Sequence, residues 1–231
     1  MREIVLDTET TGLDPSEGHR IVEIGCVELE DHSPTGKEYQ VYLNPERDMP
    51  EEAERVHGIS AAFLADKPRF AEICDGFLEF ISDAPLVIHN AGFDLKFLNF
   101  ELTRAGKAPL SAVRAIDTIE IAKSKLPGAR YSLDELCKRF EIDLTARGKH
   151  GALLDAELTA SVYFELIGGR QQRLSLAPID REEMIDASET PQTRPRPHPL
   201  APRLTAEEKE SHEAFVAREL GENTLWSRTK L

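Results

Sequence analysis

The chain has 231 residues, of which 40% are hydrophobic and 30% charged, a composition typical of a soluble globular protein. Its length allows one substantial domain with an appendage. No apolar run approaches the roughly 18 residues that a membrane-spanning helix needs, and the N-terminus lacks a signal-peptide pattern. Three widely spaced cysteines, Cys26, Cys74 and Cys137, are expected as buried thiols in a reducing cytoplasm.

The net charge of −14 argues against a nucleic-acid partner, but this charge is unevenly distributed. Residues 1–103 carry 8 basic and 22 acidic side chains, whereas residues 104–149 carry 10 basic and 6 acidic ones. A basic segment beside an acidic one suits a site that holds divalent cations next to a phosphate backbone. An uneven surface charge without any function explains the same pattern equally well.

Three strands are expected first along the chain, at about residues 2–8, 20–30 and 36–43, joined by short polar turns. The second, "RIVEIGCVELE", alternates apolar and charged residues in its second half, as a half-exposed strand does. The next stretches, "PEEAERVHGIS" and "RFAEICDGFLEFI", show the apolar spacing of helices.

Strands and helices then alternate. "PLVIHN" predicts a short buried strand, "DLKFLNFELTRAG" an amphipathic helix that stops at Gly106, and "VRAIDT" a further strand. Three strands followed by this alternation indicate an α/β fold with a mixed five-stranded sheet flanked by helices.

Two more helices are expected before the composition changes. "SLDELCKRFEI" begins with a predicted capping box of Ser132 and Glu135. "ALLDAELTASVYFELI" is a longer helix that ends at Gly168-Gly169.

Beyond Gly169 the chain changes character, with six prolines between Pro178 and Pro202. We expect a domain at residues 1–170, a flexible linker at 171–203 and a binding segment at 204–231. That last segment contains the amphipathic stretch "TAEEKESHEAFVAREL", with Thr205 as its cap, and then "NTLWSRTKL". A single helix of this length is marginal in isolation, so the segment is expected to dock on a partner.

Two carboxylates, Asp7 and Glu9, follow the apolar run that precedes them in "VLDTETTG". Residues i and i+2 of a strand point to the same face, so the two like charges would lie side by side. This arrangement is costly unless a cation neutralises the pair or the pair lies on the surface.

Further carboxylates occur at Asp94, in the first turn of a helix, and at Asp155, inside an otherwise apolar helix. An aspartate at a helix start also favours the helix dipole, so Asp94 alone has a structural explanation. Four converging carboxylates suit a site for two divalent cations that promotes phosphoryl transfer. His150, just before the second helix, is then a candidate to take a proton from the attacking water.

The stretches "DTETTG", "HNAGFD" and "HGALLDA" resemble the three motifs of the DEDDh-type 3′–5′ exonucleases, which have a ribonuclease H-like fold. With their spacing and the intervening "PEEAERVHGIS", they resemble the proofreading epsilon subunits of bacterial DNA polymerase III in particular. The resemblance covers about residues 2–170, and the three motifs together are highly specific.

This resemblance implies roles for particular residues. Asp7, Glu9, Asp94 and Asp155 would hold two divalent ions, Mg²⁺ or Mn²⁺, and His150 would be the general base. Contacts to the substrate are implied for Glu52, His57, Thr10, Thr11, Gly12 and Phe93, and also for Asp7, Glu9 and Asp155. For Gly12 we expect a close approach of the backbone to the substrate.

Two of the histidines have open alternatives. His57 is equally an ordinary surface residue at a helix end capped by Gly58. His89 and Asn90 are expected to support the site from behind the ligands, although a hydrogen-bonded core histidine explains His89 equally well.

The implied function is proofreading, in which misincorporated 3′-terminal nucleotides leave as 5′-monophosphates. A stand-alone exonuclease that trims DNA or small RNA, such as an oligoribonuclease, would have the same fold and catalytic residues. An inactive scaffold module is disfavoured because every catalytic position holds a competent residue.

The resemblance also implies two protein partners. The catalytic (alpha) subunit of the polymerase would bind residues 204–231. A sliding clamp would bind "RQQRLSLAP" through Gln171, Leu174 and Leu176, for which the alternative is the ordinary start of a linker.

Overall fold

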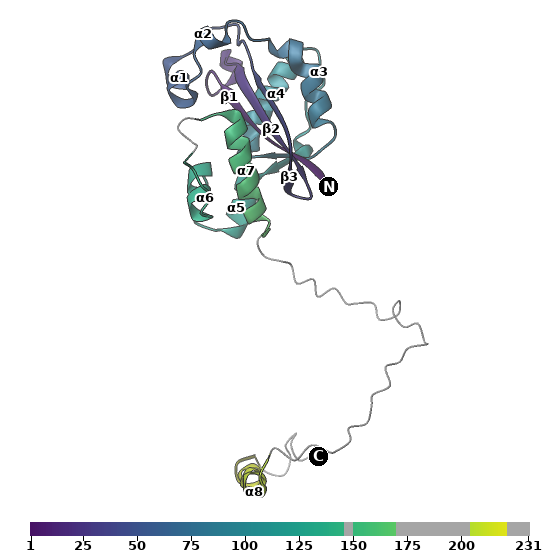
Figure 1. Cartoon of the computed structure of the whole chain (residues 1–231), viewed down its shortest axis with the longest axis vertical. Coiled ribbons are helices and arrows are strands. Elements are labelled where there is room, and N and C mark those ends of the chain that lie inside the picture. Colours follow the sequence, from purple (N-terminus) through teal and green to yellow (C-terminus); the bar gives the residue numbers. More distant parts are fainter. Residues whose placement is uncertain (146–149, 170–203, 221–231) are drawn as a thin grey trace, which may run out of the picture. The chain divides into compact units, whose positions relative to one another are not determined.

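The structure is a computed structural model that describes residues 1–145, 150–169 and 204–220. The chain divides into two units, Met1–Leu174 and Ser175–Leu231, of which the first holds the sheet and the second holds α8 (Figure 1). Within the described ranges, no helix combines the length and apolar character that crossing a bilayer requires.

The sheet has five strands in the order β3-β2-β1-β4-β5. The first three strands pair antiparallel, and β4 and β5 run parallel to β1, so the sheet is mixed as predicted. The strand bounds are β1 Arg2–Thr10, β2 Ile21–Glu30, β3 Ser33–Tyr42, β4 Leu86–Ile88 and β5 Ala115–Asp117.

The central strand β1 contributes to two cores because its side chains alternate between the two faces of the sheet. Ile4 and Leu6 pack with helices α3 and α4 in the larger core. Val5 faces the opposite way and packs with α7. Figure 1 shows α7 running across one face of the sheet. The two faces of β1 therefore meet helices that come from distant parts of the sequence.

Seven α-helices belong to the described part of the first unit. Two of them, α2 and α5, are absent from the sequence-based expectations, and the others fall where the apolar spacing predicts them. Their bounds are α1 Glu51–His57, α2 Ala61–Leu64, α3 Phe70–Ile81, α4 Ala91–Arg104, α5 Thr118–Lys125, α6 Leu133–Arg139 and α7 Ala152–Leu166. Short 3-10 helices lie at Pro15–Glu17 and Ala112–Arg114.

The predicted capping box at the start of α6 is wrong. Ser132 occupies the N-cap position but makes no side-chain hydrogen bond there. Glu135 instead accepts a hydrogen bond from Lys138 at 3.2 Å, one turn further along the exposed helix surface. The carboxylate that the box requires is therefore engaged with a cation of its own helix.

The cap of helix α8, Ala206–Phe215, is as predicted. The Thr205 hydroxyl accepts a hydrogen bond from the Glu208 N–H, and the Glu208 carboxylate accepts one from the Thr205 N–H. A single π-helical turn, Val216–Leu220, continues it.

The three cysteines are all buried thiols outside any disulfide, as expected. Burial raises the pKa of Cys26 well above its ordinary value, so this thiol stays protonated.

Candidate active site

The first two carboxylates lie on the face of β1 that α7 covers. Asp7 and Glu9 are half-buried, and they continue the face that carries Glu3 and Val5. The Glu3 carboxylate accepts a hydrogen bond from Tyr163 of α7 at 2.8 Å, which fixes the direction of this face. Both predicted ligands of the first motif therefore point toward the same helix.

Asp94 approaches β1 from α4. One of its oxygens, Oδ1, accepts hydrogen bonds from the Thr8 N–H at 3.0 Å and from the Thr8 hydroxyl at 2.7 Å. The residue is buried, and this burial raises its pKa to about 7, although the two hydrogen bonds from Thr8 act in the opposite direction. A buried carboxylate of this kind is suited to a bound cation, which would stabilise its charged form.

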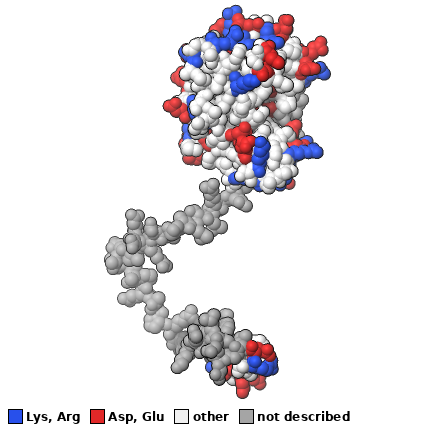
Figure 2. Space-filling view, turned by 180° about the vertical axis from the view of Figure 1, so that it is seen from behind, with Lys and Arg blue, Asp and Glu red and all other residues white. Residues whose placement is uncertain are grey.

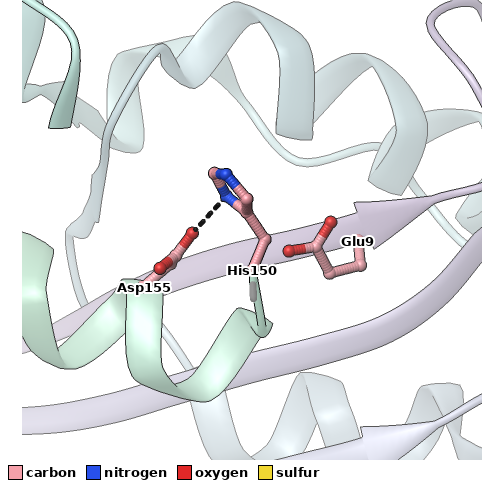
Figure 3. A group of neighbouring side chains, drawn as sticks. All are labelled: Glu9, His150 and Asp155. Carbon is pink, nitrogen blue, oxygen red and sulfur yellow. Dashed lines mark hydrogen bonds and ion pairs between the residues drawn. The ribbon is translucent and has the colours of Figure 1, made fainter. Parts of the chain in front are cut away.

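The structure brings three predicted residues together at the start of α7. Ligand atoms of Glu9, His150 and Asp155 all lie within 4.8 Å of one another (Figure 3). The His150 Nδ1 and an Asp155 Oδ2 are 3.1 Å apart. Asp155 is buried, whereas the His150 side chain is 46% exposed, so the cluster has one side open to solvent. Oxygen donors around an open position fit the hard cations Mg²⁺ and Mn²⁺.

His150 is held from two sides. Its side chain contacts Asp155, and its backbone N–H donates to the carbonyl of Val56 in the last turn of α1 at 3.3 Å. Helix α1, which carries two of the predicted nucleotide contacts, therefore lies beside the catalytic histidine candidate.

Those two contacts, Glu52 and His57, have different surroundings. Glu52 is exposed on α1. His57 is buried, and its Nδ1 accepts a hydrogen bond from the Ile59 N–H at 3.0 Å. The alternative that His57 is an ordinary surface residue is wrong, although Gly58 does cap the helix in the left-handed conformation with φ of 77°.

The loop after β1 is braced by its own side chains. The Thr10 hydroxyl donates to the Gly12 carbonyl at 2.6 Å. The buried Thr11 hydroxyl accepts from the Arg20 N–H at 3.0 Å and lies 3.1 Å from the His19 Nδ1. The Thr11 backbone N–H also donates to the Arg20 carbonyl at 2.9 Å, so residues of the same loop hold both polar groups.

Gly12 has a neighbour within the protein, and its expected close approach to a substrate stays a prediction. A Cβ on Gly12 would lie 2.3 Å from the imidazole ring of His19. The histidine thus occupies the space that the missing side chain leaves, and it packs the loop against the strand.

The remaining predicted residues surround the start of α4. Phe93 is half-buried, and its ring packs on Phe97 with centroids 5.1 Å apart. The half-buried His89 places its Nδ1 2.8 Å from the Thr118 hydroxyl, and its support of the site stays a prediction. Asn90 is exposed and precedes α4 in the left-handed conformation, with φ of 69°.

Sequence reasoning missed the residues that hold the helices on which the predicted ligands lie. Thr8 binds Asp94, Glu23 accepts a hydrogen bond from Ala152 at the start of α7, and Asp117 accepts from Ala91 at the start of α4. The sequence carries a signal for Glu23, which is an acidic residue within the apolar run "IVEIG". For Asp117 the signal is weaker, because an aspartate before a helix is common as a cap.

Charge on the outside of the first unit is mixed. On the face that Figure 2 shows, acidic and basic side chains are interspersed around a largely uncharged centre. The division into acidic and basic segments along the sequence is thus not visible as two areas of opposite charge on this face.

Comparison with known proteins identifies the class. Residues 4–163 match the family described as Exonuclease. Exonuclease X in complex with 5′ overhanging duplex DNA is 27% identical, with a TM-score of 0.57 over 72% of this chain and 91% of that chain. A structure of exonuclease I at 17% identity and a TM-score of 0.64 shares the fold over 74% of this chain and 42% of that one. The fold and the grouped carboxylates define an exonuclease with a ribonuclease H-like fold, a family whose chemistry uses divalent metal ions.

Curated relatives narrow the class further. The DNA polymerase III subunit epsilon of Rickettsia conorii is 50% identical over 223 residues, covering 94% of this chain and 96% of the relative. Its counterpart in Escherichia coli K12 is 47% identical over 176 residues, covering 73% of this chain and 72% of the relative. The chain belongs to the family of DNA polymerase III epsilon subunits.

Proposed function

We propose that this protein is the proofreading 3′–5′ exonuclease of a DNA polymerase III, which removes misincorporated 3′-terminal nucleotides as 5′-monophosphates. The observation that carries the proposal is the near full-length similarity to epsilon subunits together with the grouping of Glu9, His150 and Asp155. Similarity that continues beyond the exonuclease domain favours a polymerase subunit over a stand-alone trimming enzyme.

Four carboxylates would hold two divalent ions, Mg²⁺ or Mn²⁺. Asp7 and Glu9 would contribute from β1, Asp94 from α4 and Asp155 from α7. When bound, such ions lower the pKa of a coordinated water and stabilise charge on the reacting phosphate and the departing oxygen. The protein supplies oxygen ligands on three different elements, so their spacing depends on how these elements pack.

His150 would act as the general base for the attacking water. A half-exposed imidazole beside the carboxylate cluster can take a proton and pass it to solvent. Asp155 orients the ring through the 3.1 Å contact between its Oδ2 and the His150 Nδ1. This contact would hold the histidine at the cluster.

The 3′-terminal nucleotide would lie between α1, the β1 loop and the start of α4. Only an unpaired end can enter such a site, so a mismatched and frayed primer end is cut preferentially. The residues we assign to this contact are Glu52, His57, Thr10, Thr11, Gly12 and Phe93.

We further propose the partners and the division of the chain. Residues 1–170 would be the exonuclease domain, 171–203 a flexible linker and 204–231 the segment that binds the polymerase catalytic (alpha) subunit. The clamp-binding peptide with Gln171, Leu174 and Leu176 lies outside the described residues. A bacterial protein that acts on DNA during replication would be located in the cytoplasm.

The test combines nuclease activity with complex formation. The purified protein should release 5′-mononucleotides from single-stranded DNA only when Mg²⁺ or Mn²⁺ is present, and faster from a mismatched primer end than from a paired one. It should also co-purify with the polymerase catalytic subunit. Faster cleavage of short RNA than of DNA, without co-purification, would instead identify a stand-alone trimming enzyme.

A further inference from the structure

Strand β2 meets the first turn of α7 at a buried carboxylate, Glu23. Its Oε2 accepts a hydrogen bond from the N–H of Ala152, the first residue of α7, at 3.1 Å. Its Oε1 accepts one from the Gln40 side-chain amide at 2.7 Å. Glu23 is 1% exposed, and both its oxygens already have protein donors, so it is placed to hold the helix and not to bind a cation itself.

The same turn of α7 rests directly on the backbone of β2. A Cβ on Gly25 would lie 2.2 Å from the carbonyl carbon of Ala152 and from the nitrogen of Leu153. Glu23 and Gly25 share one face of β2, because they are two residues apart in a strand. The hydrogen bond and the close backbone contact therefore fix the same turn of α7 at adjacent points.

This contact lies opposite the predicted ligands of β1. In the antiparallel register, Glu23 pairs with Glu9 and Gly25 pairs with Asp7. Asp155 follows Ala152 by one turn, and Glu9 and Asp155 belong to the same three-residue cluster (Figure 3). A shift of the first turn of α7 along or away from β2 would therefore change the separation of Asp155 from Glu9.

The charges at this point also favour the contact. A carboxylate at a helix N-terminus interacts favourably with the unpaired N–H groups and with the helix dipole. This interaction offsets part of the cost of burying Glu23 beside Glu9. Asp155 and His150 lie at the same end of α7, so the helix start organises both groups.

We propose that Glu23 is a positioning residue, which holds the first turn of α7 against β2 and so sets the ligand spacing that divalent cations require. The inference rests on the proposed function, because it assigns Glu23 to the same site. It predicts that cation affinity depends more on the length and acceptor character of this side chain than on its charge.

The test uses three substitutions and one matched control. Glu23→Ala removes the acceptor, and Glu23→Asp shortens it. Glu23→Gln keeps its length and the acceptor oxygen for Ala152, and the Gln40 amide can turn so that its oxygen accepts from the new NH2 group. The control is Glu3→Ala, since Glu3 is a fully buried carboxylate that accepts a hydrogen bond from Tyr163 at the other end of α7. Mn²⁺ binding is measured by calorimetric titration without DNA, and thermal unfolding is measured in EDTA.

Glu23→Ala and Glu23→Asp should weaken Mn²⁺ binding by about 10–100-fold, the usual effect of losing a group that orients metal ligands. Glu23→Gln should stay within about threefold of wild type, a small change beside that loss. Glu3→Ala should lower the unfolding temperature while leaving Mn²⁺ affinity unchanged. In cleavage assays, kcat should fall for Glu23→Asp and the KM for single-stranded DNA should stay constant.

Wild-type Mn²⁺ affinity in a folded Glu23→Asp protein would overturn the proposal. So would an equal loss of affinity in Glu3→Ala, because the effect would then be general destabilisation. A wild-type protein that binds Mn²⁺ but cuts no DNA would contradict the proposed function alone, and the comparison of Mn²⁺ affinities would still decide the role of Glu23.

Discussion

Asp94 Oδ1 accepts two hydrogen bonds from Thr8, one from the backbone N–H at 3.0 Å and one from the hydroxyl at 2.7 Å. Thr8 lies between Asp7 and Glu9, so this contact ties the carboxylate of the second motif to the strand that carries the first. It engages one oxygen of Asp94 and orients the other. The short polar side chain between the two acidic residues thus has a geometric role of its own.

Thr8→Val tests this role because valine keeps the shape of threonine and lacks the hydroxyl. The loss of a buried hydrogen bond to a charged group should lower the free energy of unfolding by about 1–3 kcal/mol, measured by denaturant titration in EDTA. Mn²⁺ affinity should fall about tenfold, because Asp94 loses a group that orients it. Thr8→Ser is the control and should restore the affinity. Unchanged affinity in Thr8→Val would show that the backbone N–H alone orients Asp94.

Removal of a metal ligand should abolish activity without unfolding the protein. We expect this result for Asp7→Ala and Asp155→Ala in an assay of mononucleotide release with Mg²⁺. Without metal, Asp7→Ala should unfold at a slightly higher temperature than wild type, since one of two neighbouring like charges is gone. Even loss of a general base alone would leave at most about a hundredth of the activity. If either protein keeps more than about a tenth of wild-type activity, the ligand assignment is therefore wrong.

His150→Ala should separate catalysis from binding. General-base catalysis contributes roughly 10²–10⁴-fold, so most activity should be lost. Binding of single-stranded DNA and of Mn²⁺ should remain, because the carboxylates are intact. Fluorescence anisotropy with a labelled oligonucleotide measures DNA binding, and titration with Mn²⁺ measures metal binding. Failure to bind DNA would make His150 a substrate contact and leave the general base unassigned.

Local patterns in the sequence predict most of the fold. The apolar run before Asp7 predicts β1, and the apolar spacing of residues 70–81 predicts α3, because both patterns depend on neighbouring residues. Helix α5 was missed because it follows β5 without any turn residue between them. Asp117 ends the strand and caps the helix, accepting a hydrogen bond from the Ile119 N–H at 2.8 Å.

The supporting residues of the site escaped prediction for a different reason. Glu23 and Ala152 are 129 residues apart, and Thr8 and Asp94 are 86 apart, so no local pattern connects them. The proposed metal ligands themselves lie in recognisable motifs. The groups that hold them depend on how the strands and helices pack, which only the three-dimensional structure supplies.

The clamp peptide gives a prediction that depends on residues outside the described ranges. Gln171 and Leu174 fit the glutamine-then-hydrophobic pattern of bacterial clamp ligands, so replacing both with alanine should weaken binding to the sliding clamp. A pull-down with immobilised clamp measures the effect, and mononucleotide release from single-stranded DNA should not change. Equal retention of the wild-type and substituted proteins would discard this peptide as the clamp ligand.

Large apolar side chains in the C-terminal segment indicate a binding function. In the described part, Leu204 is 64% exposed just before α8, and Phe215, the last residue of α8, is 51% exposed. Exposed apolar side chains grouped on one short segment favour a partner that covers them. Leu225 and Trp226 add to this apolar content but lie outside the described residues.

Truncation after Arg203 should therefore leave mononucleotide release from single-stranded DNA unchanged and abolish co-elution with the polymerase catalytic subunit on gel filtration. Tethering raises the local concentration of the exonuclease at the primer end. Truncation removes the tether, so proofreading by the assembled polymerase should fall although intrinsic activity persists.

Phe215→Ser in the full chain is the finer test, since it keeps the helix and removes one exposed aromatic ring. Co-elution of the truncated protein would refute the anchor. Loss of intrinsic activity on truncation would instead show that the segment folds back on its own domain.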